Sequence, residues 1–370
     1  MRATTIRGLA LVLPLALAAC GGGGAGGNGP TSGEYLFEGN SSSSLNLATI
    51  NSSTGALGTA TLAAGSADDS VIYPGVAVSP SNSYLYAFWT SFTVIDGFAV
   101  TGPGFQLAPL PGSPFFLSVS SGSFNTLVMH PSGKFLYAVQ APATIEVISV
   151  DQSNGSLATA SVTTEAADFR VAAVDPPGRF LFVADLTGSR IFAYQVNQSD
   201  GSLSTAAGSP FSLPADSYPS IVVVDSTGKY LYALLNAGGI AAFVINTSTG
   251  ALTTVPGSPF PTTNSPVYIA VDPADSFIYV CDSDGSVDGF AIDTTSGGLT
   301  AVMGSPFSTA QAASNIAVDP SGKFVYVSIE SEQSIYGFGL DPSTGSLSPL
   351  SGSPFASIPN PTNLFIVDVQ

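Results

Sequence analysis

"GSPF" occurs five times in this chain, at 112–115, 208–211, 257–260, 304–307 and 352–355. The later copies are 47 to 49 residues apart, and the first interval, 96 residues, equals two such periods with one copy absent. Self-similarity at a fixed period of roughly 20–50 residues is the signature of repeat architectures such as solenoids and propellers. Since Pro cannot donate to a strand ladder, each copy is expected to end an outer strand and open the crossing to the next repeat.

Two further markers keep the same period. The first is a turn of the type "DPSGKF" (319–324), with related turns before most copies of the second marker. The second, an aromatic-x-aromatic unit, appears seven times: Tyr35/Phe37, Tyr84/Tyr86, Phe135/Tyr137, Phe180/Phe182, Tyr230/Tyr232, Phe277/Tyr279 and Phe324/Tyr326. Pro fixes φ and Gly tolerates positive φ, so these turns are typical of hairpins. Seven copies predict seven units.

Each unit contains four short apolar segments, for example "SNIAVD", "FVYVSI", "SIYGFGL" and "SLSPLSG", separated by Gly, Pro and Ser. No stretch has a 3.6-residue apolar period, so helix is expected to be nearly absent. Segments such as "FVYVSI" are apolar on both faces and suit sheets covered on both sides. The sequence therefore predicts an all-β, seven-bladed β-propeller with four antiparallel strands per blade.

The two ends of the repeat array predict how the propeller closes. "EYLFEG" (34–39) has the pattern of a second strand, whereas "PTNLFIVDV" (361–369) has the pattern of a first strand. One blade is therefore expected to combine three strands from 34–67 with an innermost strand from 363–369. Such closure removes open sheet edges.

The N-terminal residues have the pattern of a lipoprotein leader. A basic start is followed by "GLALVLPLALAA" (8–19) and by Cys20 within "LAAC", which resembles the bacterial lipobox. We therefore expect residues 1–19 to be a signal peptide, 20–33 to be a lipidated Cys20 with a Gly-rich tether, and 34–370 to be the propeller. The predicted location is the cell envelope, lipid-anchored at the outer membrane or periplasmic face, with an ordinary secretory signal as the alternative.

The amino-acid composition limits the classes of molecule that the protein is expected to bind. Charged residues make up 9% of the chain and the formal net charge is −17, which disfavours nucleic acid because its phosphates would be repelled. An envelope protein, a glycan or a small polar ligand remains as an expected partner, besides the membrane. With Cys20 lipidated, Cys281 has no disulfide partner, and its place in "FIYVCDSD" predicts a buried, inert thiol.

The run "VDPSGKFVYVS" with "IYGFGLDPSTGSLSPLSGSPF" resembles the lactonase family of seven-bladed propellers, which includes bacterial 6-phosphogluconolactonases, and is similar to YVTN repeats. The resemblance extends from about Glu34 to Gln370. It implies a functional region at the central mouth, where first strands begin. Arg170 matches the arginine of the family's "GPRH" motif, whereas Val171 stands in place of the following His and Leu186 in place of a family Glu.

Two candidate sites follow. Arg170 could hold a substrate carbonyl or carboxylate, with Asp168 or Asp185 as general base. Asp282, Asp284 and Asp288 surround a Gly turn in "DSDGSVD" and could bind calcium, although the segment is shorter than a full calcium loop; no other cofactor is expected. The one histidine, His130, stands where sister repeats have Asp, which predicts a turn-capping role.

Two functions remain open from the sequence. The first is a binding or interaction module on the cell envelope, favoured by the leader and by the departures from the family motif around Arg170. The second is an exported lactone hydrolase acting at the mouth. The sequence leaves open whether the protein is an enzyme.

Overall fold

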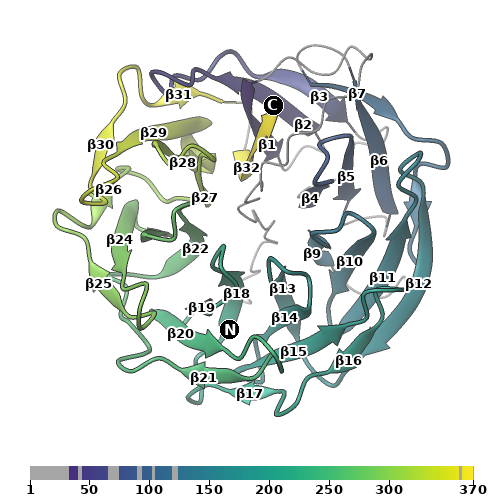
Figure 1. Ribbon diagram of the computed structural model, residues 1–370. Coiled ribbons are helices and arrows are strands. Elements are labelled where there is room, and N and C mark those ends of the chain that lie inside the picture. The colour runs from purple at the N-terminus through teal and green to yellow at the C-terminus, as the bar shows by residue number, and fades with distance from the viewer. Residues whose placement is uncertain are drawn as a thin grey trace, which may run out of the picture.

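The computed structural model describes residues 33–40, 44–65, 75–89, 94–101, 105–118, 124–357 and 361–369. Seven antiparallel sheets stand around a common axis, and each sheet presents its first strand to the centre (Figure 1). The predicted seven-bladed β-propeller is therefore confirmed. In the described residues the helical element is a 3₁₀ turn, Glu330–Glu332, and no helix there is long and apolar enough to cross a membrane.

The blades are numbered from the N-terminus. Blade 1 contains β1 (Gly33–Asn40), β2 (Ser44–Ile50), β3 (Thr61–Gly65) and β32 (Pro361–Val369). Blade 2 contains β4 (Gly75–Val78), β5 (Tyr84–Trp89), β6 (Val94–Thr101), β7 (Gln106–Pro109) and β8 (Phe115–Phe116). Blade 3 contains β9 (Phe124–Met129), β10 (Phe135–Gln140), β11 (Thr144–Val150) and β12 (Leu157–Thr164). Blade 4 contains β13 (Phe169–Val174), β14 (Phe180–Asp185), β15 (Arg190–Val196), β16 (Leu203–Thr205) and β17 (Phe211–Ser212).

The remaining blades follow the same plan. Blade 5 contains β18 (Pro219–Val224), β19 (Tyr230–Leu235), β20 (Ile240–Ile245) and β21 (Leu252–Thr254). Blade 6 contains β22 (Pro266–Val271), β23 (Phe277–Asp282), β24 (Ser286–Ile292), β25 (Leu299–Ala301) and β26 (Phe307–Ser308). Blade 7 contains β27 (Asn315–Val318), β28 (Phe324–Ile329), β29 (Ser334–Leu340), β30 (Leu347–Pro349) and β31 (Phe355–Ala356).

Blade 1 closes the ring as predicted. Its strand order is β3-β2-β1-β32, so the last strand of the chain is the innermost strand of the first blade. The two ends pair in antiparallel register, with Tyr35 opposite Val367 and Phe37 opposite Phe365, and the rings of Phe37 and Phe365 stack with centroids 4.6 Å apart. Closure thus rests on a ladder between residues more than 300 positions apart in the sequence.

Neighbouring blades are held together by the aromatic-x-aromatic units. In blades 2 to 7, the first ring of a unit packs against a glycine in the turn between third and fourth strands of the next blade, and that glycine has positive φ (70° to 78° in this turn family, for example Gly345 at 73°). The second ring, when it is Tyr, donates to the carbonyl of the same glycine, as Tyr279 does to Gly345 at 2.7 Å and Tyr326 to Gly55 at 2.7 Å. We call this paired contact the inter-blade clasp.

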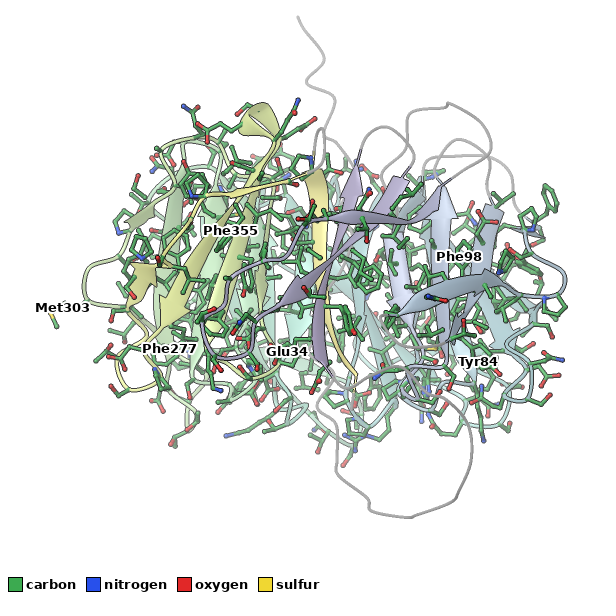
Figure 2. All side chains as sticks on the ribbon, turned by 90° about the horizontal axis from the view of Figure 1, so that it is seen from above. Glu34, Tyr84, Phe98, Phe277, Met303 and Phe355 are labelled. Atoms are coloured by element: carbon green, nitrogen blue, oxygen red, sulfur yellow. The ribbon has the colours of Figure 1, made fainter. Side chains whose placement is uncertain are left out.

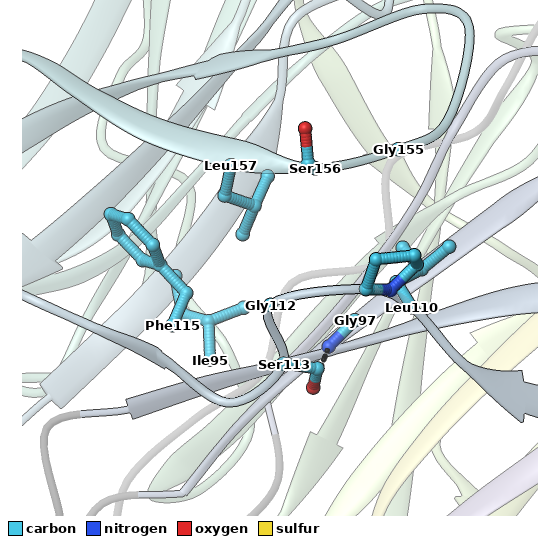
Figure 3. A pocket seen from close by; sticks show the side chains of 10 residues that line it. Ile95, Gly97, Leu110, Gly112, Ser113, Phe115, Gly155, Ser156 and Leu157 are labelled. Atoms are coloured by element: carbon cyan, nitrogen blue, oxygen red, sulfur yellow. Dashed lines mark hydrogen bonds between the residues drawn. The ribbon is translucent and has the colours of Figure 1, made fainter.

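"GSPF" ends the fourth strand as predicted, but the chain then returns to its own third strand. The Phe pairs with the beginning of that strand, for example Phe355 with Ile335. At the break the Ser hydroxyl accepts the hydrogen bond of a third-strand amide, for example Ser113 Oγ from Gly97 N at 3.0 Å (Figure 3). The other four copies repeat this bond at 2.9 to 3.0 Å. The small hollow in Figure 3 is lined by this motif and by the 155–157 turn of blade 3.

The absent copy of "GSPF" also has a structural counterpart. In blade 3 the outer strand β12 pairs with β11 from Leu157 to Thr164 without a break, apart from one bulge. Because no Pro interrupts this strand, one continuous segment provides the pairing that other blades divide between a fourth strand and the "GSPF" Phe.

The two ends of the propeller differ in their residues. The turns between first and second strands lie at one end, here called the turn end, where Tyr84 and Phe277 begin second strands (Figure 2). There Asp319 Oδ1 accepts the amide of Phe324 at 2.6 Å, and Asp175, Asp225 and Asp272 make the same bond in their own turns. The first strands begin at the opposite end, here called the mouth end, which is free of this repeated constraint.

The clasp predicts unequal costs for two similar substitutions. Gly345 and Gly352 both have positive φ, but an added Cβ would lie 2.4 Å from the Phe277 ring at Gly345 and 3.6 Å from its nearest neighbour, Phe355, at Gly352. Both Ala variants carry the φ penalty of about 1–2 kcal/mol, and Gly345→Ala adds roughly 1–3 kcal/mol of overpacking. Urea unfolding should therefore show a larger decrease in the free energy of unfolding for Gly345→Ala than for Gly352→Ala. Equal decreases in the two variants would refute the clasp.

Candidate functional site at the mouth end of blade 4

The candidate catalytic residues of the sequence come from two neighbouring strands of blade 4 and the residue before the first of them. Asp168 directly precedes β13, Arg170 is its second residue and Asp185 ends β14. The register of β13 against β14 shifts between Phe169 and Ala172, so Arg170 lies in a bulge. Bulges redirect side chains and recur next to functional sites. The structure therefore brings all three residues together at the mouth end.

Arg170 and Asp168 form an ion pair that solvent can reach. Arg170 Nη2 donates to Asp168 Oδ2 at 3.0 Å, and the two side chains are 24% and 22% exposed. Arg170 Nε is buried and has no hydrogen-bond partner within the described protein. The buried Nε cannot reach a ligand, but a guanidinium has five N–H donors and Arg170 uses one of them on Asp168. The remaining Nη donors of the partly exposed side chain lie beside an accessible carboxylate, which is an arrangement suited to binding an anionic or carbonyl oxygen.

Asp185 has a different environment. It is fully buried, and Oδ2 accepts Arg190 Nε at 2.6 Å. Its Oδ1 accepts the amides of Asp168 at 2.8 Å and Gly188 at 3.3 Å. Both oxygens are therefore engaged in holding the β14–β15 turn and the segment that leads into β13. This geometry gives Asp185 a positioning role for Asp168.

The same network reaches the next blade. Arg190 Nη2 donates to the carbonyl of Ala166 at 2.9 Å, and its neighbour Ser189 contacts the connection that leads into blade 5. Leu213 N donates to Ser189 O at 2.9 Å, and Tyr218 N to Ser189 Oγ at 3.5 Å. Tyr218 precedes β18 as Asp168 precedes β13. Tyr218 and Asp168 occupy equivalent positions of their blades. In each blade, the backbone amide of the residue that follows the second strand donates to the carbonyl of this position, at 3.0 Å in both cases.

The three residues proposed for calcium do not face one common point. Asp288 is buried, and its carboxylate accepts the amide and the hydroxyl of Thr263 at 2.6 and 2.7 Å. Asp284 is exposed and accepts Ser286 Oγ at 2.7 Å. Across the described residues, no group of three or more His, Cys, Asp or Glu is arranged to hold a metal ion. A calcium site at these residues stays a prediction for a binding measurement.

Asp282 itself is an unusual carboxylic acid. It is fully buried and occupies the position of Asp185, but Ser286 stands where Arg190 would neutralise it. Burial, followed by the charge of nearby Asp288, raises the pKa of Asp282 to about 7. Cys281 beside it is fully buried, and burial raises the pKa of its thiol, so the prediction of an inert thiol is supported.

The sequence analysis missed Tyr218 and Ser189, and it did not predict the backbone of nearby Asp216. Tyr218, Asp216 and Ser189 have positive φ, of 50°, 61° and 47°, and they are three of the eight non-glycine residues with positive φ in the described chain. No single-residue propensity predicts such a cluster. Alignment of the repeats by their turns would have placed Tyr218 beside Asp168, which was the available signal.

His130 lies at the turn end, away from this site. Ser132 N donates to His130 Nδ1 at 3.1 Å, so Nε2 carries the proton and donates to Gly178 O at 2.8 Å in the next blade. The side chain is 2% exposed, and burial lowers the pKa of the imidazole. The predicted turn-capping role is supported, with an additional bond between blades.

This geometry predicts a pH dependence of stability. The folded state disfavours protonation of His130, because burial lowers the pKa of the imidazole. The contribution of His130 to the free energy of unfolding is therefore complete above the unfolded pKa of about 6.5. It is lost as pH falls below that value, by at most about 1.4 kcal/mol per pH unit. Glu34 and Asp282, with pKa values raised to about 7, act with the opposite sign but are unchanged in a His130→Asn variant. Urea unfolding at pH 7.5 and 5.5 should show that the wild type loses more stability than His130→Asn, and equal losses would contradict this.

Comparison with known proteins agrees with the fold. Two 6-phosphogluconolactonases, from Pectobacterium carotovorum subsp. carotovorum and Pectobacterium atrosepticum, are 28% identical over 125 residues. This match covers 31% of the present chain and only 36% of the length of each relative.

Solved structures match over a longer range. The chain is similar to a putative 6-phosphogluconolactonase of Bacteroides fragilis, with a TM-score of 0.77, 19% identity, and coverage of 91% of this chain and 98% of that one. It is also similar to the periplasmic gluconolactonase PpgL of Pseudomonas aeruginosa, with a TM-score of 0.74, 18% identity, and coverage of 91% and 99%. At these identities the likeness concerns the fold.

The family model described as "Lactonase, 7-bladed beta-propeller" matches residues 118–215 and 212–304. These residues include β13 to β15 and therefore the Arg170 network. The chain belongs to the lactonase family of seven-bladed β-propellers.

Proposed function

We propose that this protein hydrolyses a neutral sugar lactone at the mouth end of blade 4. The observation that carries the proposal is the partly exposed Arg170–Asp168 pair, since its guanidinium uses one Nη donor on Asp168 and retains others, and its carboxylate is accessible. Membership of the lactonase family and the named activity of the PpgL neighbour support this reaction class. Few residues are suited to this reaction: Arg170, Asp168, and Asp185 as the residue that positions Asp168.

In this mechanism Arg170 binds the lactone carbonyl oxygen and Asp168 accepts a proton from a water molecule. The water oxygen bonds to the carbonyl carbon, and the negative charge that develops on the carbonyl oxygen is stabilised by the guanidinium. The intermediate then breaks the bond between the carbonyl carbon and the ring oxygen. Asp168 returns its proton to the leaving ring oxygen, so the product is an open-chain hydroxy acid.

The distribution of charge favours an uncharged substrate. Of the Lys and Arg side chains in the described residues, only Arg170 and Arg190 lie at the mouth end, and each already contacts an Asp. The others are in turns at the turn end: Lys134, Arg179, Lys229 and Lys323. Acidic residues outnumber cations at the mouth end, with Glu165, Asp168, Asp185, Asp216, Asp282, Asp284, Glu330 and Glu332. A phosphorylated lactone would be repelled by this end.

A second candidate function is ligand binding without turnover. It is favoured by the position of His130, the one histidine of the chain, at the turn end. The acid–base chemistry of the mouth end must therefore come from carboxylates. An envelope protein, a glycan or a small polar molecule would then be the ligand.

The proposal predicts the effect of one substitution. Removing a group that stabilises a developing oxyanion costs roughly 10²- to 10³-fold in kcat, so Arg170→Ala should lose lactone turnover by about that factor. Lys134→Ala, at the turn end, is the matched control and should retain the wild-type rate. Hydrolysis would be measured by pH-stat on phosphorylated and unphosphorylated sugar lactones.

Three outcomes separate the candidates. Turnover of unphosphorylated lactones that Arg170→Ala abolishes supports the hydrolase. Turnover that persists in Arg170→Ala contradicts the assigned site. No turnover on any lactone by the wild type rejects the hydrolase and leaves the binding module.

We also propose that the protein is exported and anchored through a lipid on Cys20. The support is the leader pattern at 1–19 with "LAAC"; residues 1–32 lie outside the described structure. Metabolic labelling with an alkyne fatty acid should mark the wild type and not Cys20→Ser. Labelling that survives this substitution would refute the anchor.

A further inference from the structure

We propose that Tyr218 forms an aromatic platform that stacks against the sugar ring of the ligand bound beside Arg170, and so selects cyclic sugars. The inference rests on the proposed function for the identity of the ligand, and it deepens that proposal by naming the residue that recognises the ring.

The first observation is the exposure of Tyr218. Its side chain is 41% exposed, and it is one of only five large apolar or aromatic residues recorded as exposed in the described chain. The second-ring tyrosines of the aromatic units, such as Tyr232 and Tyr279, are fully buried in inter-blade clasps. Tyr218 contributes to no clasp, so the scaffold does not account for its ring.

The second observation is the position of Tyr218 relative to the Arg170–Asp168 pair. Tyr218 and Asp168 occupy the same repeat position of adjacent blades, whose first strands β18 and β13 are neighbours in the ring (Figure 1). A continuous series of contacts joins them, from Tyr218 N to Ser189 Oγ, through the adjacent Arg190 to Asp185, and from Asp185 to the amide of Asp168. The backbone that carries the ring is therefore attached to the same network that positions the proposed base.

The third observation is the way the ring is held. Tyr218 Oη donates to Asp216 Oδ1 at 3.0 Å, and this bond raises the pKa of the phenol. Both residues have positive φ, which is a genuine outlier for a bulky residue such as Tyr. Strained backbone of this kind persists where the surrounding structure fixes it, and it gathers at ligand-binding sites.

The chemistry of a tyrosine ring indicates the class of ligand. A fixed aromatic face provides a large contact area at little conformational cost, together with a polar edge. The face of a sugar ring presents apolar C–H groups, and its edge presents hydroxyls for which Asp216 and Asp168 are acceptors. A neutral six-membered sugar lactone fits both features, whereas an open-chain polyol lacks a ring face.

The test uses the full chain and a ligand that cannot be hydrolysed, D-glucono-1,5-lactam, with affinity measured by calorimetry. Tyr218→Ala should weaken binding about tenfold, which corresponds to about 1.4 kcal/mol, and Tyr218→Trp should restore it. Tyr218→Gly removes the ring and also suits the positive φ, so a matching loss in that variant excludes backbone strain as the cause. Met303→Ala, whose side chain is 86% exposed on the outer rim (Figure 2), should bind as the wild type does.

The outcomes distinguish a failure of this inference from a failure of the proposed function. Weakened lactam binding in Tyr218→Ala and Tyr218→Gly, with a reduced preference for the lactam over sorbitol, supports the platform. Unchanged binding in both variants overturns it, and if Arg170→Ala still abolishes binding, the proposed site stands. If the wild type does not bind the lactam, the platform is overturned, and lactone turnover by the same preparation decides whether the proposed function survives.

Discussion

The inter-blade clasp is the contact on which the rest of the structure depends. A glycine with positive φ allows the aromatic ring of the preceding blade to approach its Cα, and a tyrosine hydroxyl satisfies that glycine's carbonyl, as in Tyr279 and Gly345. No side chain other than hydrogen fits beneath the ring without displacing it. The full clasp recurs wherever the second ring of blades 2 to 7 is a Tyr, so these blades set the positions of their neighbours. Phe182 of blade 4 lacks the hydroxyl, and Tyr35 and Phe37 of blade 1 contact Phe105 instead. Closure of blade 1 by β32 then completes a structure without a free end to its array of sheets.

Because the clasp and the Asp-capped turns involve the turn end and the outer part of the blades, the mouth end can vary. Asp185 and Asp282 each end the second strand of their blade, but the side chains around them differ. Asp185 is paired with Arg190, whereas Asp282 has Ser286 in the same place. The scaffold accommodates both. Blade 4 is where this freedom has produced a connected set of charged residues, and the adjacent connection adds an exposed tyrosine.

The sequence predicted the fold nearly completely, since "GSPF", the aromatic units and the paired ends each carry a local physical constraint. It also placed Arg170, Asp168 and Asp185 correctly at one end of blade 4. It could not predict that Asp185 would be occupied by the amides of Asp168 and Gly188, because those bonds depend on the path of two connections. The positive φ of Ser189 and Tyr218 was equally inaccessible, since neither residue type signals it, and Asp tolerates positive φ without requiring it at position 216. The return of "GSPF" to the third strand became visible only with the register.

The central claim is that the Arg170 network and Tyr218 form one binding site for a neutral sugar ring. A crystal structure of the full chain with bound D-glucono-1,5-lactam tests this claim most directly. The account predicts lactam density with its carbonyl oxygen within hydrogen-bond distance of the Arg170 guanidinium and its ring face against Tyr218. Density for the lactam at another place, such as the hollow beside Ser113, with Arg170 and Tyr218 uncontacted, would contradict it.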